Sequence, residues 1–462
     1  MSETAFAETR RLWRLALPLI GAQLAQMGMG VVDAIMAGNY GSADLAGVAL
    51  GGSIFWPVLL LMMGMLQAVT PTVSQLNGAG RVGEIGEVVR QGLWLAVIGG
   101  ICASFLLRHV GVFYTWLDVD AAATPIAIDY LTMCSYGIPA LMCFLCLRFL
   151  ADGTGFTRPA LLISVSALLI KIPLNYVFIY GVFGFPEMGG KGCGLAQAII
   201  MWWQLAMILI VVSRPRFAAT RWRYHFSWPQ WSRIKPLLMI GLPIGATVFT
   251  EMGLFSLTTL LLGRFGAETV AAHNITMNLN GVLFMPALAL GMAATIRIGF
   301  RVGANELDGA RSTALIAMLT TIGVALLGSL MIFIFRFHMV DAYTQEATVA
   351  DLAATLLLFV VVFLVFDAAQ ATALGALRGY KDTRAPMLIA LFSYWGVGLT
   401  IECTLGFGWL GEPMGVYGFW IGLAMGVGTA AVLLNLRLWR TSLNAQRIRA
   451  YAQTGDTSAP PA

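Results

Sequence analysis

Residues 352–377 read LAATLLLFVVVFLVFDAAQATALGAL, and Asp367 is the only charged residue in this stretch. A helix needs about 20 apolar residues to cross the hydrocarbon core of a bilayer, and this run is long enough. An ionisable side chain at the middle of a membrane costs roughly 2.5–3.5 kcal/mol on insertion scales. The stretch therefore predicts a membrane-spanning helix whose acidic residue either serves as a coupling-ion site or makes a structural hydrogen bond, and the first is favoured.

The composition of the whole chain fits this local pattern. Of its 462 residues, 58% are apolar and 11% are charged, whereas soluble domains are about 45–50% apolar and about 25% charged. The 28 basic and 23 acidic side chains are too few to form the polar surface of a soluble protein of this length. This excludes a cytosolic enzyme, a nucleic-acid-binding protein and a disordered chain, and it favours an all-α polytopic membrane protein.

Similar apolar runs recur along the chain, separated by segments rich in Gly, Pro and Asp such as GNYGSAD and DGTGFTRP. They predict twelve transmembrane helices: 12–36, 46–69, 91–113, 126–147, 159–182, 192–212, 236–262, 274–296, 312–335, 352–377, 385–407 and 415–438.

The distribution of Lys and Arg predicts the orientation of these helices. When each basic residue is assigned to the nearest predicted loop, 23 fall on the side of the N-terminus, four fall on the other side, and Lys171 lies inside a span. Basic residues accumulate in cytoplasmic loops. Both termini are therefore expected in the cytoplasm.

The two halves of the chain resemble each other at an offset of 225–226 residues. The matches include Leu17-Pro18 with Leu242-Pro243, Gln26-Met27-Gly28 with Glu251-Met252-Gly253, and Gly153 with Gly379. Each half holds six predicted helices, so the halves should have the same orientation. Two such bundles in one chain are typical of secondary transporters.

This repeat divides the chain into four predicted regions. Residues 1–213 and 236–440 form the N-terminal and C-terminal six-helix bundles. Residues 214–235, RPRFAATRWRYHFSWPQWSRIK, form a basic cytoplasmic linker. Residues 441–462 form a polar cytoplasmic tail.

The predicted seventh and tenth helices each carry an acidic residue near mid-membrane. Glu251 and Asp367 both lie 15 residues into their helices, or roughly 22 Å along the axis. If the two carboxyl groups face each other, burial and like-charge repulsion favour the neutral, protonated form of at least one. The pair could then exchange a proton or hold a monovalent cation such as Na⁺.

A second polar group is predicted in the first half. Asp33 lies toward the outer end of the first helix, and Lys171 and Asn175 lie on the fifth helix beside Pro173. Asp33 could serve as a proton or cation site, or it could form a static ion pair with Lys171. Lys171 could instead extend its amine to the membrane surface.

Other candidate residues receive structural interpretations. Asp129 and Glu402 are expected to be solvated or to face loops near the outer surface, and His273 is expected to cap or pack a helix rather than relay protons. Cys143 and Cys146 form a CxxC within an apolar run, which favours inert thiols. The sequence contains no GxSxG, HExxH or Walker A motif, so we expect no enzyme activity, no cofactor and an ion gradient as the energy source.

Seven segments stand out along the chain: LPLIGAQLAQMGMGVVDAIMAG (17–38), QLNGAGR (75–81), KIPLNYVFIYG (171–181), GGKGCG (189–194), LFSLTTLLL (254–262) preceded by Glu251, VAAHNI (270–275) and LRGYKDTRAPM (377–387). Together they resemble the corresponding segments of a bacterial NorM-type member of the MATE (multidrug and toxic compound extrusion) family. The resemblance implies a multidrug antiporter of the inner membrane that expels cationic or zwitterionic lipophilic drugs and dyes in exchange for H⁺ or Na⁺ by alternating access.

The same resemblance assigns functional residues. The family's acidic residue in helix 1 matches Asp33, its polar residue in helix 5 matches Asn175, and its helix 7 and helix 10 acids match Glu251 and Asp367. Relatives carry Asn at the position of Lys171, and some sodium-coupled relatives carry Tyr where this chain has Phe363. Both departures favour protons as the coupling ion.

Two other function classes remain as alternatives. A flippase for lipid-linked intermediates shares the superfamily architecture but would need a wide cationic groove, and the buried charges here are mostly acidic. An integral membrane enzyme would need a polar catalytic cluster. We expect small-molecule drugs, H⁺ or Na⁺ and the lipid bilayer as partners, no nucleic acid, and a monomer.

Overall fold

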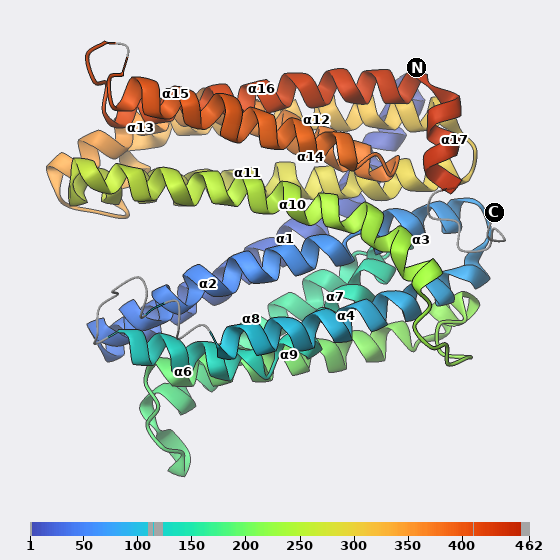
Figure 1. Ribbon diagram of the computed structural model, residues 1–462, viewed down its shortest axis with the longest axis horizontal. Coiled ribbons are helices and arrows are strands. Elements are labelled where there is room, and N and C mark those ends of the chain that lie inside the picture. Colours follow the sequence, from blue (N-terminus) through green and yellow to red (C-terminus); the bar gives the residue numbers. More distant parts are fainter. Residues whose placement is uncertain (1, 110–113, 115–122, 410, 454–462) are drawn as a thin grey trace. The chain divides into compact units, whose positions relative to one another are not determined.

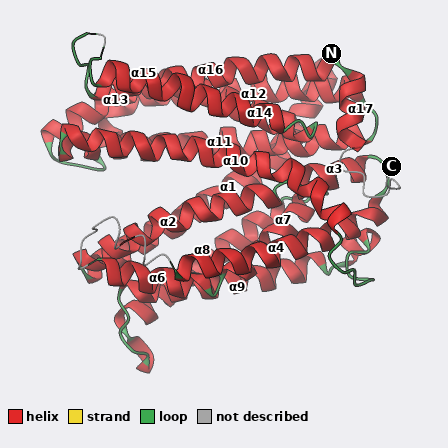
Figure 2. Ribbon diagram, in the orientation of Figure 1, coloured by secondary structure: helices red, strands yellow, loops and turns green. Residues whose placement is uncertain are grey.

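The computed structural model describes residues 2–109, 114, 123–409 and 411–453, and every regular element in these ranges is a helix (Figure 2). Within these described ranges, eleven helices are long and apolar enough to cross a membrane, and a bent helix pair brings the number to twelve. Each predicted span coincides with one of them. The end of the predicted span 91–113 lies outside the described residues from position 110 onward.

The helices follow one another as Figure 1 shows. The first half contains α1 (Ser2–Tyr40), α2 (Ser42–Leu66), α3 (Val69–Gly78), α4 (Ile85–Arg108), α6 (Thr124–Ser135), α7 (Ile138–Gly153), α8 (Arg158–Tyr180) and α9 (Gly190–Val212). The second half contains α10 (Trp231–Leu262), α11 (Ala267–Gly303), α12 (Leu307–Asp341), α13 (Ala347–Gly379), α14 (Arg384–Leu391), the π-helical turn η5 (Phe392–Gly398), α15 (Leu399–Gly406), α16 (Val416–Leu443) and α17 (Ala445–Gln453). Short 3₁₀ turns lie at η1 (Val82–Glu84), η2 (Val182–Gly184), η3 (Pro215–Thr220) and η4 (Gly263–Phe265).

The predicted fourth span, 126–147, is broken into α6 and α7, whose axes differ by 51°. Pro139 lies at the start of α7. It has no backbone N–H to donate to the preceding turn, and its ring collides with a continuing helix. The chain therefore bends at Tyr136 and Gly137 and crosses the membrane region as two shorter helices.

The described residues form two compact units, and the chain passes between them inside two helices. Pro18–Gly245 form one unit, which we call the first unit. Met1–Leu17 and Ala246–Asp456 form the other, which we call the second unit. The boundaries therefore fall within α1 and α10 rather than in loops.

A buried acidic residue explains why the beginning of α1 belongs to the second unit. Glu8 is 3% exposed. Its Oε2 accepts hydrogen bonds from Arg297 at 3.0 Å and Arg301 at 2.9 Å, and its Oε1 accepts one from Thr313 at 2.9 Å. These contacts attach the first turns of α1 to α11 and α12. The beginning of α10 packs closely within the first unit, because a Cβ on Gly245 would lie 2.7 Å from the carbonyl oxygen of Leu61.

Equivalent contacts in the two units support the internal repeat. In the first unit Gly153 of α7 packs against Thr70 of α3, where a Cβ would lie 3.0 Å from the carbonyl oxygen. In the second unit Gly379 of α13 packs in the same way on Thr295 of α11, also at 3.0 Å. Both pairs are related by the offset expected from the sequence.

Helix α13 lies at the centre of the second unit, where it packs against α11, α12 and α16. Asp367 and Gln370 on this helix are consequently buried. Beyond α16, the short helix α17 also packs onto this unit. Ile448 is 1% exposed, and Tyr451 accepts a hydrogen bond from Arg437 at 3.1 Å.

The close approach of α11 and α13 depends on glycine. A Cβ on Gly375 would lie 2.1 Å from the carbonyl oxygen of Gly291, whereas a Cβ on Gly323 of α12 would meet no atom within 4 Å. We predict that Gly375→Ala destabilises the protein by about 1–3 kcal/mol through overpacking. Gly323→Ala should leave stability unchanged or raise it, since Ala favours helix over Gly by about 1 kcal/mol. Thermal unfolding of the two purified variants in detergent tests this, and equal Tm values would contradict it.

Candidate functional site

Polar side chains from α8 and α9 lie around Asp33 of α1 in the first unit. Lys171 of α8 donates a hydrogen bond from Nζ to Asp33 Oδ2 at 2.7 Å. Asn175 of α8 donates from Nδ2 to Asp33 Oδ1 at 2.8 Å. Lys171 also donates to the side-chain oxygen of Gln197 on α9. We call these four residues the Asp33 cluster.

The geometry of α8 explains why Lys171 and Asn175 meet the same carboxylate. Residues four apart lie on one face of a helix, and both side chains are directed at α1. Lys171 is 1% exposed, so its amine does not extend to the surface. Of the arrangements that the sequence left open, the structure contains the Asp33–Lys171 ion pair.

A second cluster in the second unit joins the two mid-membrane carboxyl groups through an amide. Gln370 donates from Nε2 to Glu251 Oε1 at 2.8 Å and to Asp367 Oδ1 at 3.2 Å. Its Oε1 accepts a hydrogen bond from the hydroxyl of Tyr394 at 2.7 Å. We call Glu251, Asp367, Gln370 and Tyr394 the Glu251 cluster. The structure thus places the two predicted carboxyl groups within hydrogen-bonding distance of the same donor, the side-chain amide of Gln370.

The charge of the Glu251 cluster is not cancelled by an ion pair. The ion pairs formed among the described residues include neither Glu251 nor Asp367. Arg378, near the end of α13, interacts with Glu251 only electrostatically. A buried carboxylate beside a partly buried one, without a paired cation, is costly, and a proton or a monovalent cation would relieve that cost.

Gln370 and Tyr394 are site residues that the sequence interpretation missed. Gln370 lies one turn after Asp367 on α13, and that spacing was the signal available in the sequence. Tyr394 lies in η5. A π-helical turn inside a membrane helix often marks a functional position, but no sequence pattern predicted that this turn would form.

Two other acidic candidates have different environments. The Asp129 side chain is 53% exposed and lies 3.4 Å from Lys191, as expected of a surface residue. Glu402 is fully buried and accepts a hydrogen bond from Thr258 at 2.7 Å, so the prediction that it is solvated is wrong. The helices α10 and α16 cover it, and Gly422 allows α16 to approach its backbone.

His273 is a packed side chain. It is 1% exposed, its Nε2 lies 3.1 Å from the Thr259 hydroxyl, and its ring packs edge-on against Trp420 at 5.6 Å between centroids. This agrees with the structural interpretation of the residue.

The described part of the chain contains neither a cluster of metal ligands nor a disulfide bond. The described residues contain no group of three or more His, Cys, Asp or Glu side chains arranged to hold a metal ion. Cys143 and Cys146 are free thiols. The oxygen atoms that a Na⁺ ion could use at the Glu251 cluster belong to two carboxyl groups, one amide and one hydroxyl.

Known proteins of similar sequence align with this chain over nearly its whole length. A family model described as MatE matches residues 18–177 and 243–404, two ranges that begin at repeat-equivalent prolines. A probable multidrug resistance protein NorM from Idiomarina loihiensis is 38% identical, over 95% of this chain and 96% of that protein. The multidrug resistance protein PmpM from Pseudomonas aeruginosa is 40% identical, over 98% and 96%.

Solved structures agree in fold. The crystal structure of the eukaryotic MATE transporter AtDTX14 superimposes with a TM-score of 0.88 at 21% identity, covering 97% of this chain and 99% of that one. The Vibrio cholerae MATE transporter VcmN in its bent form gives 0.85 at 18% identity, covering 98% and 99%.

We predict that the Asp33–Lys171 ion pair contributes to the stability of the folded protein. Lys171→Met would leave a buried carboxylate without its cation, which costs about 3–5 kcal/mol. The double variant Asp33→Asn/Lys171→Met removes both charges and should recover most of this loss. Lys191→Met breaks an exposed pair and should cost no more than about 1 kcal/mol.

Thermal unfolding of the three purified variants in detergent measures these differences. A Tm for Lys171→Met that equals that of Lys191→Met, or that the double variant fails to improve, would contradict the ion pair as a stabilising contact.

Proposed function

We propose that this chain, which belongs to the MATE family of multidrug efflux transporters, exports cationic or zwitterionic lipophilic drugs and dyes in exchange for protons. It is a multi-pass protein of the bacterial inner membrane. The observation that carries the proposal is the Glu251 cluster, in which one amide joins the buried carboxyl group of Asp367 to the partly buried one of Glu251, with neither in an ion pair among the described residues.

The Glu251 cluster can exchange a drug for protons because no ion pair cancels the charge of its carboxyl groups. When the binding site opens to the cytoplasm, an ionised Glu251 or Asp367 favours a cationic drug. When it opens to the outside, proton uptake neutralises the carboxyl groups and the drug is released. Gln370 holds the two carboxyl groups near one donor in both states, so a proton on one changes the environment of the other. The distribution of Lys and Arg supports cytoplasmic termini for this cycle.

Asp33 has a different role in this proposal. Its charge is already neutralised by Lys171, so a proton or a cationic substrate must compete with that amine. Asp33, Lys171 and Asn175 therefore act as a secondary site whose ion pair responds to protonation. The same neutralisation weakens the flippase alternative, because Lys171 offers no free positive charge to an anionic lipid-linked substrate.

The surroundings of Asp367 support protons over sodium. Phe363 lies one turn before Asp367, is fully buried and packs edge-on against Trp420 at 6.2 Å. Its ring provides no oxygen ligand for a metal ion. A proton needs only one carboxylate oxygen, and the cluster provides that.

The role of Glu251 can be tested by removing its charge. We predict that Glu251→Gln lowers gradient-driven ethidium efflux from proteoliposomes by roughly tenfold or more, within the usual range of coupling between two sites. Glu268→Gln, at an exposed position in the first turn of α11, serves as the matched control and should transport normally. Efflux by Glu251→Gln at the wild-type rate would reject the coupling role of this glutamate.

The coupling ion can be tested separately with purified protein. In proteoliposomes we expect a proton gradient alone to drive ethidium transport, and a sodium gradient at equal pH on both sides to drive none. We expect no sodium-driven transport because the phenyl ring of Phe363 has no oxygen atom that could coordinate Na⁺ beside Asp367. Transport driven by sodium alone would replace H⁺ with Na⁺, and no transport under either gradient would favour the flippase.

A further inference from the structure

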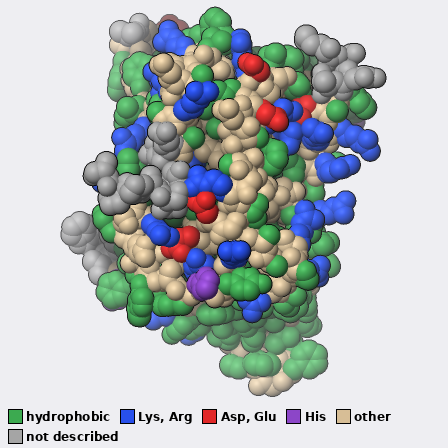
Figure 3. All heavy atoms as spheres, turned by 90° about the vertical axis from the view of Figure 1, so that its right-hand side faces the viewer, with side chains coloured by type: hydrophobic (Ala, Val, Ile, Leu, Met, Phe, Trp, Pro, Cys, Tyr) green, Lys and Arg blue, Asp and Glu red, His purple; other side chains and the backbone are tan. Residues whose placement is uncertain are grey.

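The segment between α9 and α10 is strongly basic and contains no acidic residue. Residues 214–235 include five Arg and one Lys but neither Asp nor Glu. The distribution of charge predicts this segment on the cytoplasmic side. Figure 3 shows Lys and Arg side chains gathered at the end of the helices from which this segment emerges. We call it the basic linker.

Hydrogen bonds to α4 hold the basic linker in a defined position. Trp94 donates from its indole nitrogen to the Ser227 carbonyl oxygen at 2.9 Å. Gln91 donates to the Trp228 carbonyl oxygen at 3.0 Å and accepts from the Gln230 amide at 2.9 Å. The rings of Trp94 and Trp228 are also stacked. The linker is therefore a packed part of the first unit.

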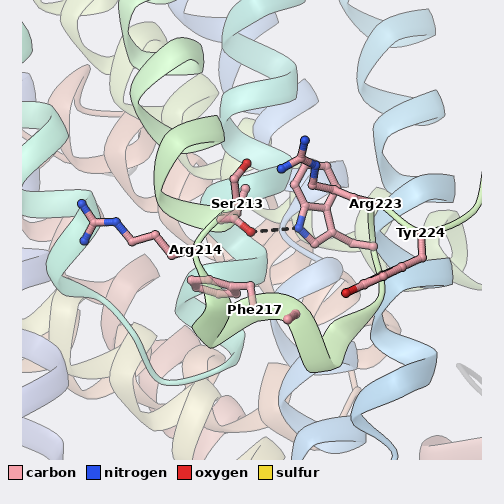
Figure 4. Close-up of a pocket in the computed structure, with 8 residues that line it drawn as sticks. Ser213, Arg214, Phe217, Arg223 and Tyr224 are labelled. Atoms are coloured by element: carbon pink, nitrogen blue, oxygen red, sulfur yellow. Dashed lines mark hydrogen bonds between the residues drawn. The ribbon is translucent and has the colours of Figure 1, made fainter.

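The basic linker forms a hollow directly after the last residue of α9. The hollow has a volume of about 320 Å³ and is lined by Val212, Ser213, Arg214, Phe217, Ala218, Trp222, Arg223 and Tyr224. Trp222 donates from its indole nitrogen to the Val212 carbonyl oxygen at 3.0 Å and so ties the linker to the helix end (Figure 4). Figure 4 shows Tyr224 on one side of the hollow and Arg214 on the other, with its side chain pointing outward from the hollow.

Two arginines at this hollow are not neutralised by carboxylates. Neither Arg214 nor Arg223 takes part in an ion pair among the described residues. Nearby, Arg233 differs, because it lies 3.1 Å from Glu87. Guanidinium groups match the geometry of phosphate oxygens. The charge at the hollow is therefore available to an anionic group.

Exposed aromatic side chains indicate that this surface meets lipid. Tyr224, Phe226, Trp228 and Trp231 are 66%, 72%, 71% and 67% exposed. Trp and Tyr, whose rings are amphipathic, are enriched at the level of the phospholipid headgroups. The hollow begins where a membrane-spanning helix ends, which places it at that same level.

We propose that the basic linker binds the headgroup of an anionic phospholipid, with Arg214 and Arg223 facing the phosphate. Basic pockets at the cytoplasmic ends of transmembrane helices are suited to such headgroups. A free phosphate ion shares the charge but gains nothing from the exposed rings or from the position beside the acyl chains.

The test measures binding of dihexanoyl phosphatidylglycerol, a short-chain anionic lipid, to the purified full-length protein in detergent. Its dissociation constant follows from the concentration dependence of Tm. Dihexanoyl phosphatidylcholine and inorganic phosphate are titrated in parallel. The variant Arg214→Gln/Arg223→Gln removes two charges at the hollow. The control Arg447→Gln/Arg449→Gln removes two charges from α17.

We expect phosphatidylglycerol to stabilise the wild type and the control variant. The Arg214/Arg223 variant should bind it roughly tenfold or more weakly, since each basic residue near an anionic surface contributes separately. Its Tm without lipid should match the wild type, because both side chains lie at the surface.

Three outcomes would overturn the proposal. Equal weakening in both double variants would assign binding to general surface charge. Equal stabilisation by phosphatidylcholine or by inorganic phosphate would remove the specificity for an anionic lipid. The absence of stabilisation of the wild type by phosphatidylglycerol would reject the site itself.

Discussion

In the hydrocarbon core of a bilayer no water is available to a polar group, so each one must find its partner inside the protein. This chain meets that constraint in three ways. Asp33 has a cation, Lys171, and its charge is neutralised. Glu402 has a single hydroxyl, that of Thr258. Glu251 shares one amide with Asp367, which provides hydrogen bonds but cancels no charge. The second and third arrangements both leave a carboxylate charge uncancelled, and only in the third do two carboxyl groups share one donor, so that a proton on one changes the surroundings of the other.

The amide of Gln370 is suited to this position because it has two N–H donors and one acceptor. It can donate to two carboxyl groups while its oxygen is held by Tyr394. A lysine in the same place would neutralise one carboxylate permanently, as happens at Asp33. A neutral bridge keeps the two acids close and leaves their protonation to the surroundings. Its buried position follows from the place of α13 at the centre of the second unit.

The sequence predicts the spans well, because hydropathy and the distribution of Lys and Arg act over whole helices. An Asp33–Lys171 ion pair is also among the alternatives that the sequence predicts, because a buried charge needs a partner of opposite charge. Gln370 and Tyr394 could not be found in this way, because a neutral polar residue inside a helix carries no comparable penalty. Glu402 was misjudged because its burial depends on α16, whose close approach at Gly422 is a tertiary contact. Periodicity along one helix contains no information about such neighbours.

The two compact units share α1 and α10, and this has a mechanical consequence. The chain leaves one unit for the other at Leu17–Pro18 and again at Gly245–Ala246, and Glu8 fixes the short end of α1 to the second unit. Each crossing lies at or near a proline, Pro18 in α1 and Pro243 in α10, and proline has no backbone N–H to donate to the preceding turn. The covalent connection between the units is therefore continuous helix, and its most easily bent turn lies close to each boundary.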